Sequence, residues 1–528
     1  MTATPVPRSA RRRTVLRALA VAVALVGGST PARGGAAFAA GPETYTLTVR
    51  HLDREGRTTA PYRSQVTGIS GPGAEASATL DDPSGVTTVR LPRGRYVLDS
   101  TLASGLEPGG TIWTDWIVQP RLDLDRDTTV VVDARTTAPV DVRPPDGSAR
   151  FEKSSMFVEV SHGGATRTVN VNNGSTNLRV AHLGPETEAG AVKQWFDANW
   201  KGDTADYLLG QTFTGTRALT GLTRHYAAGE LATLNVRGAT GPGSAGTGLI
   251  GVLPTDGPTI GVSRSLATPG TATFLVTPGR GTWDVSYTAP RADGGAPTTY
   301  LADRIAVRAG ATATHTFDGP VFGPALTGRP AVSRDGDRIT ADVPLFADGD
   351  GHVPWTASAE TAYTSLYRDG VLVGAASGTP GRGEFTVAPG AASYRLAATA
   401  TRKAAVGATT RVTASWTFAS ATTAEPTALP VSVVRFSPEL GTAGTATAGR
   451  PIRIPVTVQG AAADGRTRSL TVSASTDGGA SWTRLPLDAG AATLRNPPAG
   501  TAVSLRAELT DTAGNTLDQT VTDAYRTE

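Results

Sequence analysis

The chain contains no cysteine among its 528 residues. This absence excludes disulfide bonds, thiol nucleophiles, cysteine-ligated zinc and iron–sulfur clusters. A chain of 528 residues predicts ~3–5 domains. Apolar residues make up 39% of the chain, which is enough to build several buried cores and excludes a disordered protein.

Helical periodicity is almost missing, and the patterns are typical of β-structure. Glycine (62 residues) and proline (36) are abundant, as in turn-rich proteins. Residues 44–52, 128–134, 166–173 and 451–459 alternate between apolar and polar positions or run in β-branched residues, as strands do. Residues 188–200 fit either a helix or an aromatic strand. We therefore expect an all-β protein.

No apolar run in the leader is long enough to cross a membrane. Residues 18–26 fall short of the ~20 residues that a bilayer requires. They follow Arg11-Arg12-Arg13 and precede Ala37-Phe38-Ala39, an A-x-A cleavage pattern. Residues 1–39 are therefore predicted to be an export signal, either twin-arginine-like or a cationic Sec signal. With no lipobox cysteine, apolar C-terminal tail or LPxTG-type signal, we expect a secreted protein without a membrane anchor.

The formal net charge of +3 is set by the leader. Six arginines lie before residue 40, in a stretch without acidic residues, and the remainder holds 43 basic against 46 acidic residues. A basic patch for a nucleic-acid partner is therefore not expected.

Familiar catalytic motifs are missing from the sequence. The histidines form no HExxH motif, and neither G-x-S-x-G nor S-x-x-K occurs. We interpret the histidines as dispersed surface residues: His51, His162, His182, His225, His315 and His352. Gly241, Gly243 and Gly246 match G-x-G-x-x-G but lack the helix and acidic residue of a dinucleotide site, so they predict a loop. We expect no enzyme, and a hydrolase with a site assembled from distant residues is an alternative.

A short pattern recurs along the chain, in residues 91–98, 276–285, 387–396 and, more loosely, 497–505. In the first three a strand ends near a proline, the chain turns at glycine, and the next strand begins with an aromatic residue. We interpret each copy as a hairpin within one of four β-sandwich modules. The aromatic residues Tyr96, Trp283 and Tyr394 are expected in the cores.

Proline- and glycine-rich segments predict the limits of these modules. We place them at residues 40–136, 137–318, 319–424 and 425–528. The second is long enough for one sandwich or for two divided at residues 238–248.

Two carboxylates are candidate metal ligands. Asp348 and Asp350 in Asp-Gly-Asp-Gly could converge on calcium, the one cofactor that the sequence admits. The rest of a calcium loop is missing, since His352 and Val353 follow where an oxygen ligand and a glycine are required. A solvated turn is the alternative.

Four tryptophans are candidates for a sugar-binding platform: Trp113, Trp116, Trp195 and Trp200. Trp113 and Trp116 lie three residues apart in an expected strand, so they face opposite sides and one is expected in a core. Most tryptophans are mainly buried, which is the alternative interpretation of all four.

Residues 475–482, with Asp477 and Trp482, resemble the Asp-box turn of sialidases, in which the carboxylate ties the turn and the tryptophan packs beneath it. The same string occurs in immunoglobulin-like sandwiches. We expect a structural turn at Asp477 and Trp482.

The strings VTTVRLPRGRYVLDS, QPRLDLDRDTTVVVDAR, VFGPAL, PLFADGDGH, TSLYRDG and VSASTDGGASW follow in one order along the chain. In that order they resemble the accessory region behind the catalytic domain of secreted actinomycete subtilisin-like serine peptidases. The peptidase domain, with its Asp, His and GTSM-type Ser segments, is missing, so no residue inherits a catalytic role. The first module also resembles transthyretin-like carboxypeptidase regulatory domains through residues 91–96, and the last resembles immunoglobulin-like domains through residues 511–515.

The resemblance implies a secreted, non-catalytic binding or accessory protein. Its expected partner is an extracellular protein or a cell-wall polymer. A carbohydrate-binding protein, suggested by the tryptophans, is the alternative beside the hydrolase.

Overall fold

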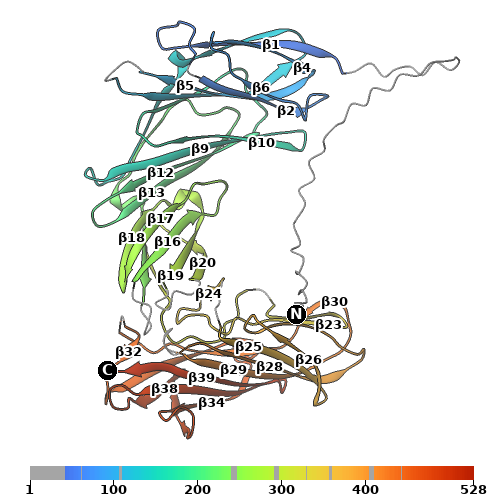
Figure 1. Ribbon diagram of the computed structural model, residues 1–528, viewed down its shortest axis with the longest axis vertical. Coiled ribbons are helices and arrows are strands. Elements are labelled where there is room, and N and C mark those ends of the chain that lie inside the picture. The colour runs from blue at the N-terminus through green and yellow to red at the C-terminus, as the bar shows by residue number, and fades with distance from the viewer. Residues whose placement is uncertain are drawn as a thin grey trace, which may run out of the picture. The chain divides into compact units, whose positions relative to one another are not determined.

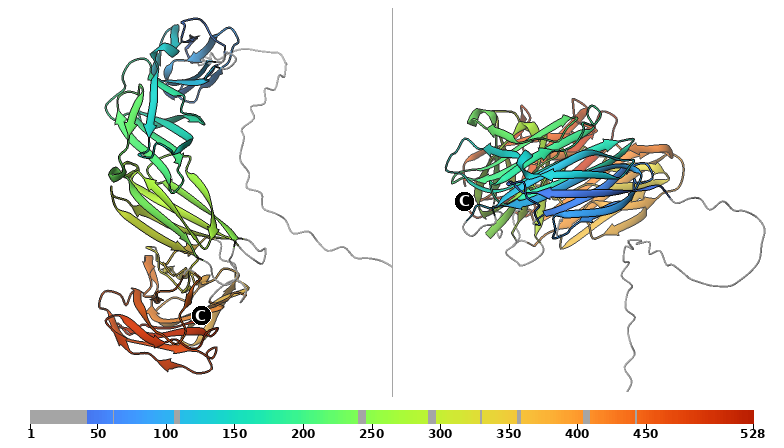
Figure 2. Two further views of the ribbon diagram at one scale, coloured as in Figure 1. Left: turned by 90° about the vertical axis from the view of Figure 1, so that its left-hand side faces the viewer. Right: turned by 90° about the horizontal axis from the view of Figure 1, so that it is seen from above.

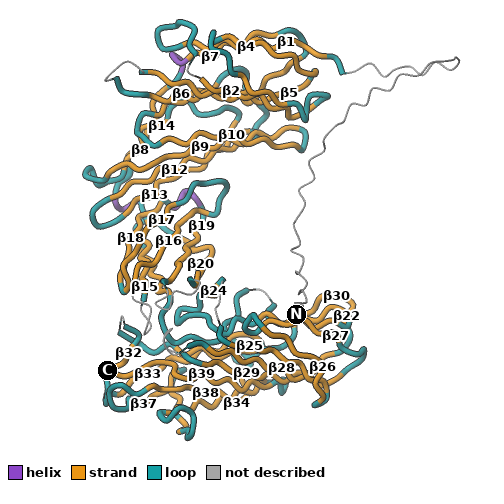
Figure 3. Tube along the Cα trace, viewed as in Figure 1, coloured by secondary structure: helices purple, strands orange, loops and turns teal. Residues whose placement is uncertain are grey.

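The computed structural model describes residues 42–60, 62–105, 110–239, 246–290, 297–328, 330–355, 359–403, 409–441 and 443–528. Residues Thr44–Glu528 form one compact unit. Strands make up most of it, and its described helical elements are the short 3-10 helices η1 (Ala134–Thr136), η2 (Ala228–Glu230) and η3 (Pro278–Arg280) (Figure 3). The all-β fold is therefore confirmed. The predicted export signal lies outside the described residues, as do Gly241 and Gly243.

The described part of the chain contains no helix that is long and apolar enough to span a membrane.

The strands of the N-terminal part of the chain form two sheets. A three-stranded sheet, in the order β4–β1–β7, consists of β1 (Thr44–Leu52), β4 (Val86–Pro92) and β7 (Thr128–Asp133). A seven-stranded sheet, in the order β14–β8–β11–β6–β5–β2–β3, consists of β2 (Tyr62–Ser70), β3 (Ser77–Leu80), β5 (Gly94–Ser104), β6 (Trp113–Leu124), β8 (Ala138–Arg143), β11 (Leu178–His182) and β14 (Leu222–His225). The predicted strands at residues 44–52 and 128–134 are confirmed as β1 and β7.

A second seven-stranded sheet packs against the first seven-stranded sheet, on the face opposite the three-stranded sheet. Its order is β10–β9–β12–β13–β18–β15–β21, with β9 (Arg150–His162), β10 (Ala165–Asn173), β12 (Val192–Lys201), β13 (Asp206–Gly215), β15 (Ala232–Gly238), β18 (Gly270–Val276) and β21 (Thr312–Phe317). The ambiguous segment 188–200 contributes the strand β12.

The central strands β5 and β6 of the first seven-stranded sheet are largely buried on both faces, between the neighbouring sheets (Figure 1). Tyr96 and Leu98 on β5 pack with the three-stranded sheet, whereas Val97 between them packs in the core shared with β9 and β12. Neighbouring residues are therefore all apolar, as in a strand with two buried faces. The predicted boundary between residues 136 and 137 falls between strands of this one sheet, because β11 pairs with β6. The module limits stay predictions.

A five-stranded sheet faces β13, β18, β15 and β21 across a further core. Its order is β17–β16–β19–β20–β24, with β16 (Gly246–Pro254), β17 (Val262–Thr268), β19 (Thr282–Ala289), β20 (Thr298–Ala306) and β24 (Val353–Pro354). Figure 2 shows these strands, coloured green to yellow, from two further sides.

The C-terminal part contains three sheets. One follows the order β27–β23–β22–β30, with β22 (Val332–Gly336), β23 (Arg338–Asp342), β27 (Arg382–Thr386) and β30 (Thr423–Ala428). The nine-stranded sheet β26–β25–β28–β29–β39–β38–β34–β35, with β32 beside β39, consists of β25 (Thr361–Arg368), β26 (Val371–Ser377), β28 (Ala392–Thr401), β29 (Arg411–Ser420), β32 (Thr445–Ala446), β34 (Thr467–Ser475), β35 (Thr483–Arg484), β38 (Ala502–Asp511) and β39 (Thr516–Thr527). The last, β31–β33–β37–β36, consists of β31 (Ser432–Phe436), β33 (Pro451–Gly460), β36 (Leu487–Asp488) and β37 (Ala491–Arg495).

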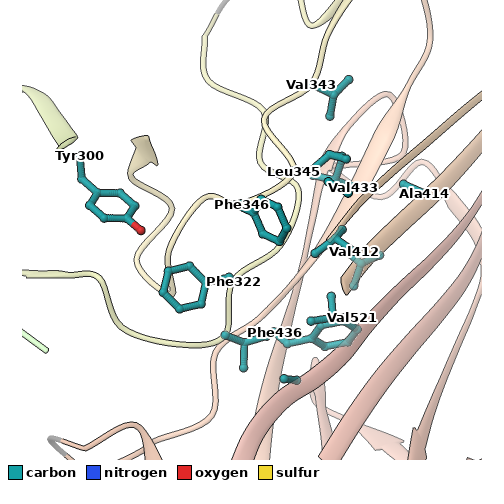
Figure 4. Close-up of a cluster of buried hydrophobic side chains, with 14 of the residues drawn as sticks. Tyr300, Phe322, Val343, Leu345, Phe346, Val412, Ala414, Val433, Phe436 and Val521 are labelled. Carbon is teal, nitrogen blue, oxygen red and sulfur yellow. The ribbon is translucent and has the colours of Figure 1, made fainter. Parts of the chain in front are cut away.

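Residues from both predicted C-terminal modules share one core. Figure 4 shows Phe346 and Val412 together with Phe436 and Val521, all of them buried. The backbone joins the modules as well, since β29 pairs with β39 over seven residue pairs. The predicted boundary between residues 424 and 425 lies within β30, a strand of this assembly.

The repeated proline–glycine pattern links two sheets rather than two paired strands. The strands flanking each copy, β4 and β5, β18 and β19, β27 and β28, and β37 and β38, belong to different sheets. The predicted hairpins are therefore wrong, because the turn carries the chain across the ~10 Å between packed layers. The expected burial of Tyr96, Trp283 and Tyr394 is confirmed.

The polar tips of two of these aromatic residues explain why they follow the crossing. The Tyr96 hydroxyl donates to the Pro92 carbonyl at 2.5 Å, and the Trp283 indole N–H donates to the Thr277 carbonyl at 3.2 Å. Each ring thus fills the space between the layers while its tip bonds the last residues before the turn.

Candidate functional site

The four candidate tryptophans divide between the interior and one cleft. Trp116 on β6 lies in the core between the two seven-stranded sheets. Trp195 on β12 is also buried and is covered by the turn at Gly257, where an added Cβ would lie 2.2 Å from the indole ring. Trp113 and Trp200 both line a cleft of about 520 Å³. We call it the Trp200 cleft.

Aromatic residues line one wall of the Trp200 cleft. Trp200 on β12 pairs across the sheet with Phe151 on β9. Their rings meet edge to face, with centroids 5.2 Å apart and planes at 80°. Phe196, four residues before Trp200 on β12, lies on the same wall. A cleft of this volume is of the size that holds small ligands.

An arginine covers one face of the Trp113 ring. The guanidinium of Arg179 lies over its ring, 3.5 Å from the centroid, which occupies one face of the indole. Trp200 is therefore the tryptophan whose ring belongs most clearly to the cleft wall.

Polar groups line the rest of the cleft: Asp141, Arg143, Asp146, Ser175, Thr176 and Asn177 are among them. The Asp141 carboxylate accepts from Arg143 Nε at 2.6 Å and lies 2.9 Å from His225 Nε2. Burial opposes ionisation of Asp141, but these two hydrogen bonds outweigh it and hold its pKa below the ordinary value. The cleft thus combines an aromatic wall with the Asp141–Arg143 ion pair and with hydroxyl and amide groups.

The candidate calcium ligands Asp348 and Asp350 lie in the loop before β24. Asp348 is fully buried, and its carboxylate accepts from the backbone N–H of His352 at 2.8 Å and of Asp318 at 3.1 Å. Asp350 accepts from the Thr316 N–H at 2.8 Å. Among the described residues no group of three or more His, Asp or Glu side chains is placed to hold a metal ion. The calcium site stays a prediction.

The expectation of dispersed surface histidines is wrong. His51, His182 and His352 are buried. His352 Nε2 lies 3.4 Å from His315 Nδ1, although 37 residues separate them. Burial, together with the charge of His352, lowers the pKa of His315. Alternation alone could not reveal this pair, because His352 lies in a loop and follows a buried aspartate.

We expect His51 on β1, which is buried, to make the N-terminal sheets less stable in acid. Its Nε2 lies 2.7 Å from the Ser64 hydroxyl, and its ring stacks on Tyr62 with centroids 3.6 Å apart. Burial lowers its pKa to about 4, against a smaller raising effect of the Gly85 carbonyl. Below its ordinary value near 6.5 the unfolded chain binds a proton that the folded chain does not. Stability is therefore present above that pH and lost as the pH falls from there toward 4.

We expect the free energy of unfolding to fall by about 2 kcal/mol more in the wild type than in His51→Gln between pH 7.5 and pH 5. Chemical denaturation at both pH values measures this difference. Equal falls in the two proteins would show that His51 is protonated in the folded state.

The turn at residues 475–482 is tied by its aspartate. Asp477 Oδ1 accepts from the Ser475 hydroxyl at 2.7 Å and from the Ser481 N–H at 2.9 Å. These hydrogen bonds, that of Ser475 first, hold the pKa of Asp477 well below its ordinary value. Trp482 lies beside Gly479. The Asp477 carboxylate therefore makes these hydrogen bonds within its own turn.

The sequence alone does not mark Phe151 or Asp141 as part of a site. Each lies in an alternating strand, and a strand pattern does not tell which end of a core stays open. The pairing of Phe151 with Trp200 joins residues 49 positions apart, which depends on the register of β9 and β12.

Comparison with known proteins identifies no family. No protein-family model matches the chain, and no curated protein does. Solved structures that overlap with it include a streptococcal ancillary pilin, at 10% identity over 52% of this chain and 99% of that one, with a TM-score of 0.13. Another is BcpA, the major pilin subunit of Bacillus cereus, at 11% identity over 52% and 99%, with a TM-score of 0.14. The Bacillus anthracis TIE protein overlaps at 12% identity over 67% and 69%, with a TM-score of 0.13. Likenesses at these TM-scores carry no argument about this chain.

Proposed function

We propose that the chain is a secreted, non-catalytic binding protein of several β-sandwich modules, and that it holds a polysaccharide of the cell wall in the Trp200 cleft. The observation that carries the proposal is the open aromatic wall of Trp200 and Phe151 beside fixed polar groups. The apolar face of a sugar ring packs on an aromatic ring, and its hydroxyls bond to carboxylate, amide and guanidinium groups.

The resemblance to accessory regions of secreted serine peptidases supports the same class of function. Such a region would bind a target on behalf of a separate catalytic partner. This chain itself carries none of the catalytic segments of that family. Accessory binding beside an extracellular peptidase is therefore the wider setting that we propose, with an extracellular protein as the competing partner. Secretion itself is proposed from the leader at residues 1–39.

Co-sedimentation of the purified chain with insoluble chitin, cellulose and peptidoglycan tests the proposal. We expect retention on at least one polymer. Burying an aromatic side chain contributes roughly 1.5–3 kcal/mol, so Trp200→Ala is expected to lower the affinity about 10- to 100-fold. Trp355→Ala is the matched control, because Trp355 is 76% exposed and lies outside the cleft.

Trp200→Phe is the conservative variant, since it keeps an aromatic ring against Phe151. We expect it to bind more tightly than Trp200→Ala and to melt closer to the wild type, because it loses less packing against the core. Equal retention of wild type and Trp200→Ala, or retention on none of the three polymers, would contradict the proposal and leave the extracellular protein as the partner to pursue.

A further inference from the structure

A second candidate site lies in a different cleft, of about 1300 Å³, lined by β20, β24 and the loop that holds Asp348. His315 on β21 and His352 in the loop both line it. Their rings lie with centroids 5.6 Å apart and planes at 47°. The two nitrogens that face each other, His315 Nδ1 and His352 Nε2, are 3.4 Å apart.

This separation fits a shared metal ion. Two imidazole nitrogens bound to one tetrahedral zinc ion at about 2.0–2.1 Å lie about 3.4 Å from each other. The same distance also allows a long direct hydrogen bond between the two ring nitrogens. The pair is thus spaced for a shared cation as well as for a direct bond.

The Asp348 carboxylate fixes the orientation of the His352 ring. Its Nδ1 lies 3.0 Å from the Asp348 carboxylate, which is buried and held by backbone N–H groups. A carboxylate can only accept, so Nδ1 carries the proton and Nε2 presents its lone pair toward His315. Stacking on Phe317, with centroids 4.1 Å apart, holds the ring in place. A carboxylate behind a histidine is the usual support of a metal-bound imidazole.

The cleft leaves room for the other ligands. No further protein side chain completes a group of three ligands among the described residues, so water would fill the remaining positions. Asp350 lines the same cleft and supplies a negative charge near His315. Its Oδ2 accepts from the Thr316 N–H, so we do not count it as a ligand.

We propose that His315 and His352 bind one divalent transition-metal ion of the zinc type, with Asp348 as the residue that orients His352. The ligands are then ring nitrogens. The Asp348 carboxylate, a candidate calcium ligand in the sequence, orients His352 instead. The Asp350 carboxylate, the other candidate, lies near the ion as a negative charge. This site is independent of the polysaccharide proposed for the Trp200 cleft.

Titration of the purified, metal-free chain with zinc chloride in a calorimeter tests the proposal, using protein without a histidine tag. We expect one zinc ion per chain, and His315→Ala is expected to weaken binding at least tenfold. His162→Ala is the matched control, because the described contacts of His162 are with Arg95 and Glu188 rather than with a second histidine. It is expected to bind zinc as the wild type does.

The melting temperature with and without zinc is a second measurement, which can be made even if a variant is less stable. A bound ion stabilises the folded chain by mass action, so zinc should raise the melting temperature of the wild type and of His162→Ala but not of His315→Ala. No zinc binding, or equal binding by wild type and His315→Ala, would overturn the proposal. Tighter binding of calcium than of zinc, lost in Asp350→Asn, would also overturn it in favour of an oxygen-ligated site.

Discussion

Tyr394→Asp is expected to unfold the C-terminal sheets at a temperature at which the wild type is folded. Tyr394 on β28 is 1% exposed and packs against Phe418, with ring centroids 6.1 Å apart. The aspartate removes the ring, which leaves a cavity, and places a carboxylate in an apolar core. Together these cost roughly 4 kcal/mol or more. A thermal melt should show the transition lower by roughly 10 °C.

The neighbourhood of Tyr394 supplies the control. Arg334 Nη1 donates to its hydroxyl at 3.3 Å, so a cation lies close to the introduced carboxylate. That cation cannot fill the space of the lost ring, and a large loss is still expected. Tyr394→Phe keeps the ring and gives up one hydrogen bond, at a cost of about 1 kcal/mol. Equal melting of Tyr394→Asp and Tyr394→Phe would refute the placement of this residue between the sheets.

Arg435→Met is expected to loosen the loop that carries Asp348 and His352. Arg435 on β31 is buried, and its guanidinium donates to the carbonyls of Gly323 at 2.9 Å and Pro324 at 3.2 Å. It also donates to the Asp348 and Gly349 carbonyls. The arginine thus ties two loops to β31.

Methionine would fill much of the volume and relieve the cost of burying a cation. It would remove the arginine donor from four carbonyl groups. The Asp348 carbonyl keeps the Gly351 N–H at 2.9 Å, so the cost is about 1–3 kcal/mol for each of the other three that stays buried and unpaired. We expect a net loss of roughly 3 kcal/mol and faster hydrogen exchange in residues 348–352 than elsewhere. Arg435→Lys keeps the charge but not the planar fork, so it should fall between the two. Unchanged exchange in this loop would contradict the role assigned to Arg435.

The strands were predictable because burial on one face imposes a period of two on the sequence. Residues 44–52 and 451–459 form β1 and β33 nearly at the predicted limits. Pairing between strands was not predictable in the same way. The proline–glycine pattern announces a turn, yet nothing in it tells whether the next strand joins the same sheet or the facing one. Tyr96 and Trp283 are buried in either case, so their burial does not distinguish a hairpin from a crossing.

The candidate sites depend on contacts between distant segments. Trp200 was recognised as a possible sugar contact, but only the register of β9 against β12 brings Phe151 beside it. Nothing in the sequence indicates that His315 and His352 lie close together, because 37 residues separate them. The sequence shows the charge of Asp348, but its buried position behind His352 follows from the loop rather than from the Asp-Gly-Asp-Gly pattern.

Oxidative footprinting of the tryptophans tests the central claim, that the Trp200 cleft holds a polysaccharide. The chain is exposed to hydroxyl radicals with and without soluble fragments of the polymer that retains it, and oxidation is located by mass spectrometry. We predict several-fold slower oxidation of Trp200 in the presence of the fragments and an unchanged rate at the exposed Trp355. Protection of Trp355 with no change at Trp200 would contradict the account and move the binding surface away from this cleft.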